Sequence, residues 1–205
     1  MIAYKFLSPG AVGPFSRFQW PLPVQGVPGP WVEARGSRWE GIHACLPDDL
    51  PYWLDAELWR TELAGTIEEV PLQLVAQRGR LVGRVDRWDA DMATRFAEDC
   101  AMRLRDRAVT HLQAGGLAEA AVALSRAVDS AALVQVTSSL AAGVPGIGSI
   151  LVAFVGDAAG AALAGSAAGA SYVAARALDR TGGGPAAFAA ERTVQARWLE
   201  RKLAL

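Results

Sequence analysis

The chain has 205 residues, of which 52% are hydrophobic, and a formal net charge of −1. This length suits one domain or two small ones. Because its charges nearly cancel, the chain has no basic field to attract a nucleic-acid backbone, and we expect no nucleic acid among its partners. Lys5 and Lys202 are its only lysines, so almost all of the positive charge is arginine.

The first ten residues hold no apolar run of the length that a secretory signal needs before Pro9 and Gly10 interrupt the chain. The two cysteines, Cys45 and Cys100, are too few for a disulfide framework. A cytoplasmic protein is therefore expected.

The N-terminal part, residues 1–88, is rich in tryptophan and proline and has the pattern of short strands and turns. Strands are expected at Ile2–Leu7, 31–34, 41–45, 58–63, 66–70, 73–76 and 80–85. Gly65, Pro71 and Gly79 are expected to separate the last four strands. Apolar residues at helical spacing predict a short helix over 49–59. The aromatic side chains, among them Trp20, Trp31, Trp39, Trp53, Trp59 and Trp88, are expected to fill a core that so short a domain could not otherwise build.

From residue 89 onward alanine becomes common and the apolar period becomes helical. Helices are expected at 89–114, 117–142, 147–178 and 186–203, with glycine- or proline-containing breaks between them. The sequence thus predicts an α+β protein: an N-terminal small antiparallel β-rich domain (1–88) followed by a C-terminal antiparallel four-helix bundle (89–205).

The first expected helix carries two different stripes at four-residue spacing. Its apolar stripe is interpreted as buried, and consists of Met92, Phe96, Cys100, Leu104, Ala108 and Leu112. Its charged stripe alternates in sign, is interpreted as a solvated face, and consists of Asp91, Arg95, Asp99 and Arg103.

Residues 130–175 carry one formal charge, Asp157. A surface helix needs a polar face, so this segment must be buried in its own domain, in an oligomer or in a bilayer. The favoured interpretation is a hairpin in the bundle core, where small residues allow close approach at Gly156, Gly160, Gly165 and Gly169.

Two other interpretations of this segment stay open. The segment could pair with copies of itself, as a stalk or as a cavity for a lipid-like or quinone-like molecule. Membrane contact is less favoured, because the strongest apolar run, 147–155, is too short to span a bilayer.

His43 and Cys45 would face the same side of a strand, because side chains alternate along it. An imidazole beside a thiol can activate a cysteine nucleophile. Two neighbours on one strand are seldom placed for proton transfer, however, so we favour a structural role among the tryptophans and keep both residues as weak catalytic candidates.

No metal or cofactor site is expected. Cys100 and His111 would lie roughly 16 Å apart along one helix, whereas zinc ligands lie about 2 Å from the ion. The glycine-rich segment 143–148 follows a helix rather than a strand and has no following lysine, so it does not match a phosphate-binding loop.

Glu191, Gln195 and Trp198 lie on one flank of the last helix, at offsets of four and seven residues. Polar groups at such positions are expected to form hydrogen bonds across an interhelical seam and to fix its register, with the Trp198 ring adding buried area. The alternative is a recognition surface.

The pattern Tyr172-Val-Ala-Ala-Arg176, followed by Ala190-Glu191-Arg192, Gln195 and Trp198-Leu199, resembles the C-terminal signature of the Ala-rich helical immunity proteins of bacterial toxin systems. The resemblance covers about 88–205 and includes Phe96-Ala-Glu-Asp-Cys100-Ala, which is similar to the helix that opens that domain. It implies binding to another protein rather than catalysis. The Val-Pro-Gly-Ile-Gly break departs from the family pattern.

The N-terminal part resembles a small bacterial and phage domain of unknown function through Tyr4-Lys5, Gly41-Ile-His-Ala-Cys45 and Leu50-Pro-Tyr52. This second resemblance implies no activity.

We therefore expect a non-enzymatic protein-binding module, immunity-like in character, whose partner is a toxin or a multi-subunit complex. An oligomeric scaffold subunit, with apolar helices that form a stalk or cavity or touch a membrane, is the alternative. A Cys–His enzyme is the second alternative.

Overall fold

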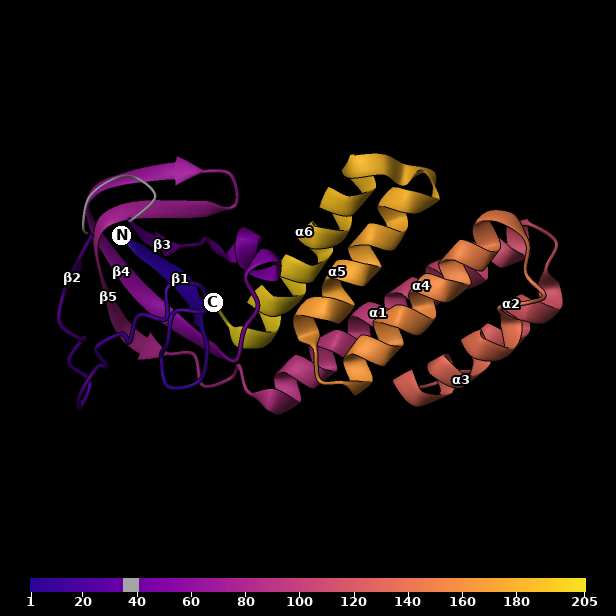
Figure 1. Cartoon of the computed structure of the whole chain (residues 1–205), viewed down its shortest axis with the longest axis horizontal. Coiled ribbons are helices and arrows are strands. Elements are labelled where there is room, and N and C mark those ends of the chain that lie inside the picture. Colours follow the sequence, from indigo (N-terminus) through magenta and orange to yellow (C-terminus); the bar gives the residue numbers. More distant parts are fainter. Residues whose placement is uncertain (35–40) are drawn as a thin grey trace. The chain divides into compact units, whose positions relative to one another are not determined.

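The computed structural model describes residues 1–34 and 41–205, and the chain divides into two compact units. The first unit consists of Met1–Ala90 with Ala196–Leu205, and the second of Asp91–Gln195. The fold is α+β: in the described part of the chain, an antiparallel sheet of five strands is followed by six α-helices (Figure 1).

The sheet contains β1 (Ile2–Leu7), β2 (Val32–Glu33), β3 (Ile42–Ala44), β4 (Glu57–Val70) and β5 (Gln73–Arg84). The strand order is β1-β4-β5-β2, and β3 also pairs with β5. Tyr4 and Cys45 exchange two backbone hydrogen bonds of 2.9 and 2.7 Å, so the residue after β3 lies beside β1. The sheet therefore curls far enough for β1 and the end of β3 to meet, which forms a small, partly closed barrel.

The expected breaks at Gly65 and Gly79 were wrong, because β4 and β5 run through both glycines as one long hairpin. Gly65 has a φ of +77° and lies at a bulge between Ala64 and Ile67, where the strand bends without ending. Gly79 stays paired with Leu63, and a Cβ atom there would lie 2.5 Å from Cγ2 of Ile42. Both glycines therefore serve the curvature and close packing of the sheet.

The helix expected over 49–59 is a shorter 3₁₀ helix, η2 (Pro47–Tyr52), and the chain is already extended in β4 by Glu57. Pro51 lies inside η2. Proline cannot donate the backbone hydrogen bond that an α-helix needs, so the helix cannot continue.

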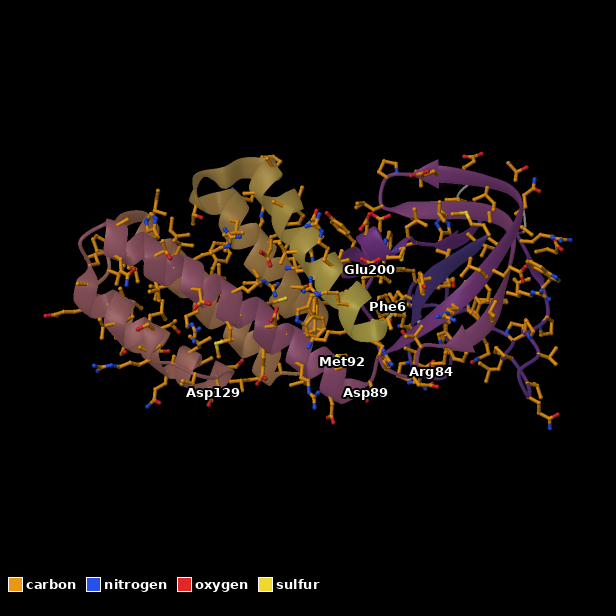
Figure 2. The ribbon with its side chains drawn as sticks, turned by 180° about the vertical axis from the view of Figure 1, so that it is seen from behind. Phe6, Arg84, Asp89, Met92, Asp129 and Glu200 are labelled. Atoms are coloured by element: carbon orange, nitrogen blue, oxygen red, sulfur yellow. The ribbon has the colours of Figure 1, made fainter. Side chains whose placement is uncertain are left out.

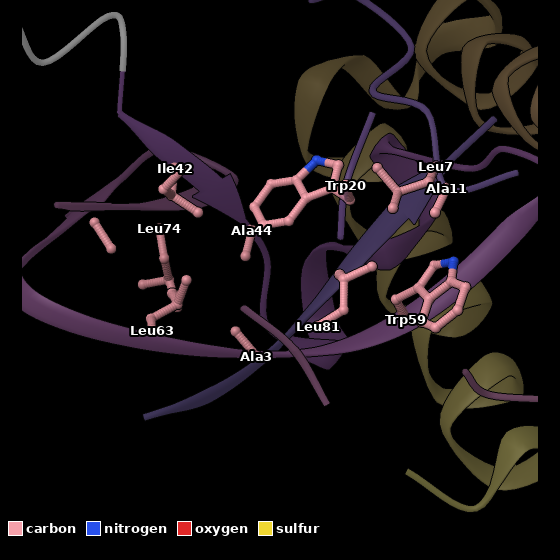
Figure 3. Packing of buried hydrophobic residues seen from close by; sticks show 11 residues of the cluster. Ala3, Leu7, Ala11, Trp20, Ile42, Ala44, Trp59, Leu63, Leu74 and Leu81 are labelled. Carbon is pink, nitrogen blue, oxygen red and sulfur yellow. The ribbon is translucent and has the colours of Figure 1, made fainter. Parts of the chain in front are cut away.

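The core of the first unit lies on one face of the curled sheet. Figure 3 shows Trp20 in this cluster together with Leu7, Ala11 and Ala44. Trp20, Trp59 and Trp88 are buried, as expected for core aromatic residues, whereas Trp31 and Trp53 are partly exposed. Trp39 lies outside the described residues.

Six α-helices replace the four that the sequence predicts. They are α1 (Ala90–Ala114), α2 (Ala118–Ser125), α3 (Ser130–Leu140), α4 (Gly146–Leu163), α5 (Ala167–Leu178) and α6 (Gly184–Leu203). Within the second unit, α3 packs beside α4 and α4 beside α5. The last turns of α6 belong to the first unit and its earlier part to the second.

The two long helices expected at 117–142 and 147–178 were wrong because local capping divides each of them. Asp129 (Figure 2) is extended, and its side chain accepts a 2.8 Å hydrogen bond from the backbone nitrogen of Ala132, so α3 begins anew. Gly165 has a φ of +71°, and the Ser166 hydroxyl accepts from the nitrogen of Gly169 at the start of α5.

The buried stripe of α1 is confirmed at Phe96, Cys100, Leu104, Ala108 and Leu112, while Met92 is partly exposed.

Two glycines of β5 allow the packing of the hairpin to be tested. Replacing Gly79 with alanine forces its new methyl group against Ile42, and we expect the free energy of unfolding to fall by about 1–3 kcal/mol. Gly83→Ala is the matched control, since no atom lies within 4 Å of the added Cβ. Urea unfolding measures both, and equal losses of stability in the two variants would contradict the close approach at Gly79.

Candidate functional site

A hollow of about 1280 Å³ opens in the first unit. Its described lining comes from β1, β2, β3, the start of β5, the segment between β1 and β2, and the region around η2. Eight aromatic side chains contribute to it: Tyr4, Phe6, Phe15, Phe18, Trp20, Trp31, Tyr52 and Trp53. Lys5 also lines it, and so do both weak catalytic candidates, His43 and Cys45.

The structure places His43 and Cys45 in alternation with Ile42 and Ala44, whose side chains belong to the core cluster. The His43 ring makes its hydrogen bond with the side chain of Gln73, at 2.9 Å between Nδ1 and Oε1. Burial raises the pKa of the Cys45 thiol to about 12, and the nearby Asp49 carboxylate acts in the same direction. The thiol is therefore protonated at neutral pH, whereas nucleophilic attack requires the thiolate.

Lys5 is the charged residue of this region that the sequence reasoning missed. Lys5 lies on the same face of β1 as Ala3 and Leu7, which belong to the core cluster, and it is half-buried. Its ammonium donates a hydrogen bond to the backbone oxygen of His43 and lies 5.3 Å from the centroid of the Trp20 ring. Burial lowers the pKa of Lys5 to about 8. A lysine at an inward position of an apolar strand was the signal that could have identified it.

In the second unit, Glu191 and Gln195 belong to a buried polar cluster that joins three helices. The Glu191 carboxylate accepts hydrogen bonds from Arg103 of α1 at 2.8 Å and from Gln195 at 3.2 Å. Gln195 also donates to the backbone oxygen of Ser171 on α5, at 3.0 Å. The contacts with Arg103 and Ser171 cross between helices, as the spacing of Glu191 and Gln195 predicts, whereas the contact between Gln195 and Glu191 lies within α6.

Arg192 completes this cluster, although its spacing did not single it out. Its guanidinium donates to the Ser171 hydroxyl at 3.1 Å and to the side-chain oxygen of Gln195 at 3.0 Å. The same group lies 5.2 Å from the ring centroid of Phe188. Arg192 is 4% exposed and Glu191 is 2% exposed, so opposite charges are buried together.

The interpretation of Arg103 as part of a solvated face was wrong. Its guanidinium pairs with Asp99 one turn earlier on α1 and also reaches the buried carboxylate of Glu191. The alternating charges along α1 predict the ion pair between Asp99 and Arg103, one turn apart. A pattern along one helix contains no information about Glu191, which comes from another helix.

Trp198 follows Gln195 by three residues and belongs to the part of α6 that lies in the first unit. It is buried, and the Lys202 ammonium lies 5.9 Å from its ring centroid.

The four glycines singled out in residues 130–175 have different surroundings. A Cβ atom at Gly156 would lie 2.7 Å from Oγ1 of Thr137, so α3 and α4 approach closely there. A Cβ atom at Gly169 would lie 3.3 Å from that of Ala161 on α4. Gly160 has open space around it, and Gly165 serves the left-handed turn between α4 and α5.

Residues 130–175 are only partly buried in the single chain. On α4, Ile147 and Ile150 are 45% and 43% exposed, and Asp157 is the one charged residue of that helix. On α3, the uncharged polar side chains of Gln135, Ser138 and Ser139 are exposed, on the side away from the buried Leu133 and Thr137. Among the described residues, one helix, α4, has the length and the apolar composition that crossing a membrane requires. This is a weak sign, because the buried core helix of a protein can have the same length and composition.

Among residues 1–34 and 41–205, no three histidine, cysteine, aspartate or glutamate side chains lie together in a way that could hold a metal ion. Cys100 is buried in the stripe of α1, and burial raises the pKa of its thiol. The chain matches no protein-family model, no curated protein and no solved structure.

The state of the thiols can be measured directly. Because both cysteines are buried and burial raises the pKa of each thiol, we expect neither to react with Ellman's reagent in the folded protein at pH 8. Both should react after unfolding in guanidinium chloride, which serves as the control. Rapid labelling of Cys45 in the folded chain would instead support an activated nucleophile beside His43.

The polar cluster predicts a large effect of one conservative change. Glu191→Gln removes the negative charge that faces Arg103, and we expect the free energy of unfolding to fall by about 3 kcal/mol. Glu200→Gln changes an exposed side chain of the same helix and should alter it by less than about 0.5 kcal/mol. Chemical denaturation measures the free energy of unfolding of both variants. An unchanged value for Glu191→Gln would show that the buried charge is dispensable.

Proposed function

We propose that the chain is a non-enzymatic protein-binding module, immunity-like in character, and that it binds its partner through the exposed apolar surface of α4 around Ile147 and Ile150. The observation that carries this proposal is the exposure of Ile147 and Ile150 on a helix with one charged residue. These residues are three positions apart and share one face of α4.

The surroundings of this surface support a protein partner. The centre of a protein–protein interface is apolar and depleted of charged residues. Ile147 and Ile150 follow the exposed residues 141–143, which carry no charge, and α3 holds no charged residue either. The protonated Cys45 thiol also makes a Cys–His enzyme the less supported function.

Photocrosslinking tests this surface. Benzoylphenylalanine replaces Ile150 in the full chain, expressed in cells of the source organism, and in a control variant it replaces Val194, an exposed apolar residue of α6. We expect position 150, and not position 194, to form an adduct with a different protein. Intact mass identifies the adduct.

Two results would overturn the proposal. An adduct of twice the chain mass from position 150 would show that a second copy covers this surface, which is the scaffold alternative. Equal adducts from both positions would show that the α4 surface has no preferred partner. As a further check on the contact itself, Ile150→Asp should weaken binding of the identified partner by about tenfold or more, while Val194→Asp should leave it unchanged.

A further inference from the structure

We propose that the hollow of the first unit binds a small organic anion with a flat aromatic body, and that the Lys5 ammonium binds its carboxylate. This site is separate from the α4 surface and does not depend on the function proposed for it.

The charge of the ligand follows from the contacts of Lys5. An ammonium group has three N–H donors, and within the described residues that of Lys5 has one hydrogen-bond acceptor, the backbone oxygen of His43. No carboxylate pairs with Lys5 in this part of the chain. A half-buried cation with donors to spare and no counter-ion among residues 1–34 and 41–205 favours an anion that accepts from it.

The acidic residues that line the hollow do not fill this role, because each has a partner of its own. The Glu33 carboxylate lies 3.7 Å from the guanidinium of Arg78. The Asp55 carboxylate accepts from the Ser8 hydroxyl at 2.8 Å and from the backbone nitrogen of Ala56 at 2.7 Å.

The body of the ligand follows from the walls. The described lining holds eight aromatic rings, of which Phe15 is 85% and Phe18 43% exposed. Phe18 stands edge-on to Trp20, with 5.6 Å between the ring centroids, and Lys5 lies beside Trp20. A flat aromatic group in this hollow can therefore stack on rings while its carboxylate reaches the ammonium.

The size and chemistry of the hollow fit a small molecule. Its volume of about 1280 Å³ exceeds what a drug-sized ligand needs, roughly 300–1,000 Å³. A few polar groups among mainly apolar walls is the usual character of such sites. Aromatic rings alone would also attract a cationic ligand, but the positive charge of Lys5 opposes one.

A matched pair of probes tests the inference. Naphthoate and naphthamide share the same aromatic body, and only naphthoate is charged at pH 7. Each is titrated into the full chain, with binding measured by calorimetry and the site located from shifts of the Trp20 indole signal in NMR spectra. We expect naphthoate to bind about tenfold more tightly than naphthamide, because the ammonium meets a full negative charge in naphthoate and only a neutral carbonyl oxygen in naphthamide.

The two lysines of the chain provide the matched variants. Lys5→Met should abolish most of the preference for naphthoate, whereas Lys202→Met should keep it, although the Lys202 ammonium also lies near a tryptophan ring. Lys5→Arg keeps the charge and should retain the preference. Equal affinity of the folded wild-type chain for the two probes, or no saturable binding of naphthoate, would overturn the inference without recourse to any variant.

Discussion

The second unit depends on the buried polar cluster around the Glu191 carboxylate, in which Glu191 accepts from Arg103 of α1 and Gln195 donates to Ser171 of α5. Helices built from alanine and glycine offer few large side chains to interlock, so their packing alone leaves neighbouring positions similar in energy. The Glu191 carboxylate, the Gln195 amide and the guanidinium groups of Arg103 and Arg192 have their hydrogen-bond partners in the observed alignment of the helices. The hydrogen bonds therefore supply the register that the small apolar side chains cannot, and the Ala-rich sequence depends on a few polar residues for its specificity.

Structural features that depend on residues close together in the sequence could be predicted from it. The bounds of β1 agree with the strand expected at Ile2–Leu7, before Pro9 and Gly10 interrupt the chain, and the four-residue stripe of α1 identified its buried face. The divisions at Asp129 and Ser166 were missed because apolar periodicity continues across them, while the caps that create them involve single side chains. Gly65 was misread for a related reason: a glycine within a strand can mark a bulge as readily as an end.

The candidate sites show the same limit in three dimensions. Helical spacing identified Glu191 and Gln195 as seam residues, but their partners Arg103 and Ser171 come from helices far away in the sequence. Lys5 stood in a strand pattern that already marked its neighbours as buried, and only the curl of the sheet shows that His43 and Trp20 surround it. The hollow has no linear signature because its lining comes from separate segments.

The membership of α6 in both units bears on the order of events during synthesis. The first unit includes Ala196–Leu205, yet its other residues end at Ala90, so the whole second unit is made in between. Leu199 and Leu203, both buried, cannot take their places until more than a hundred further residues have left the ribosome. A nascent chain that stalls before this point therefore presents an incomplete first unit, and the N-terminal half of this protein, though made first, is among the last parts to be finished.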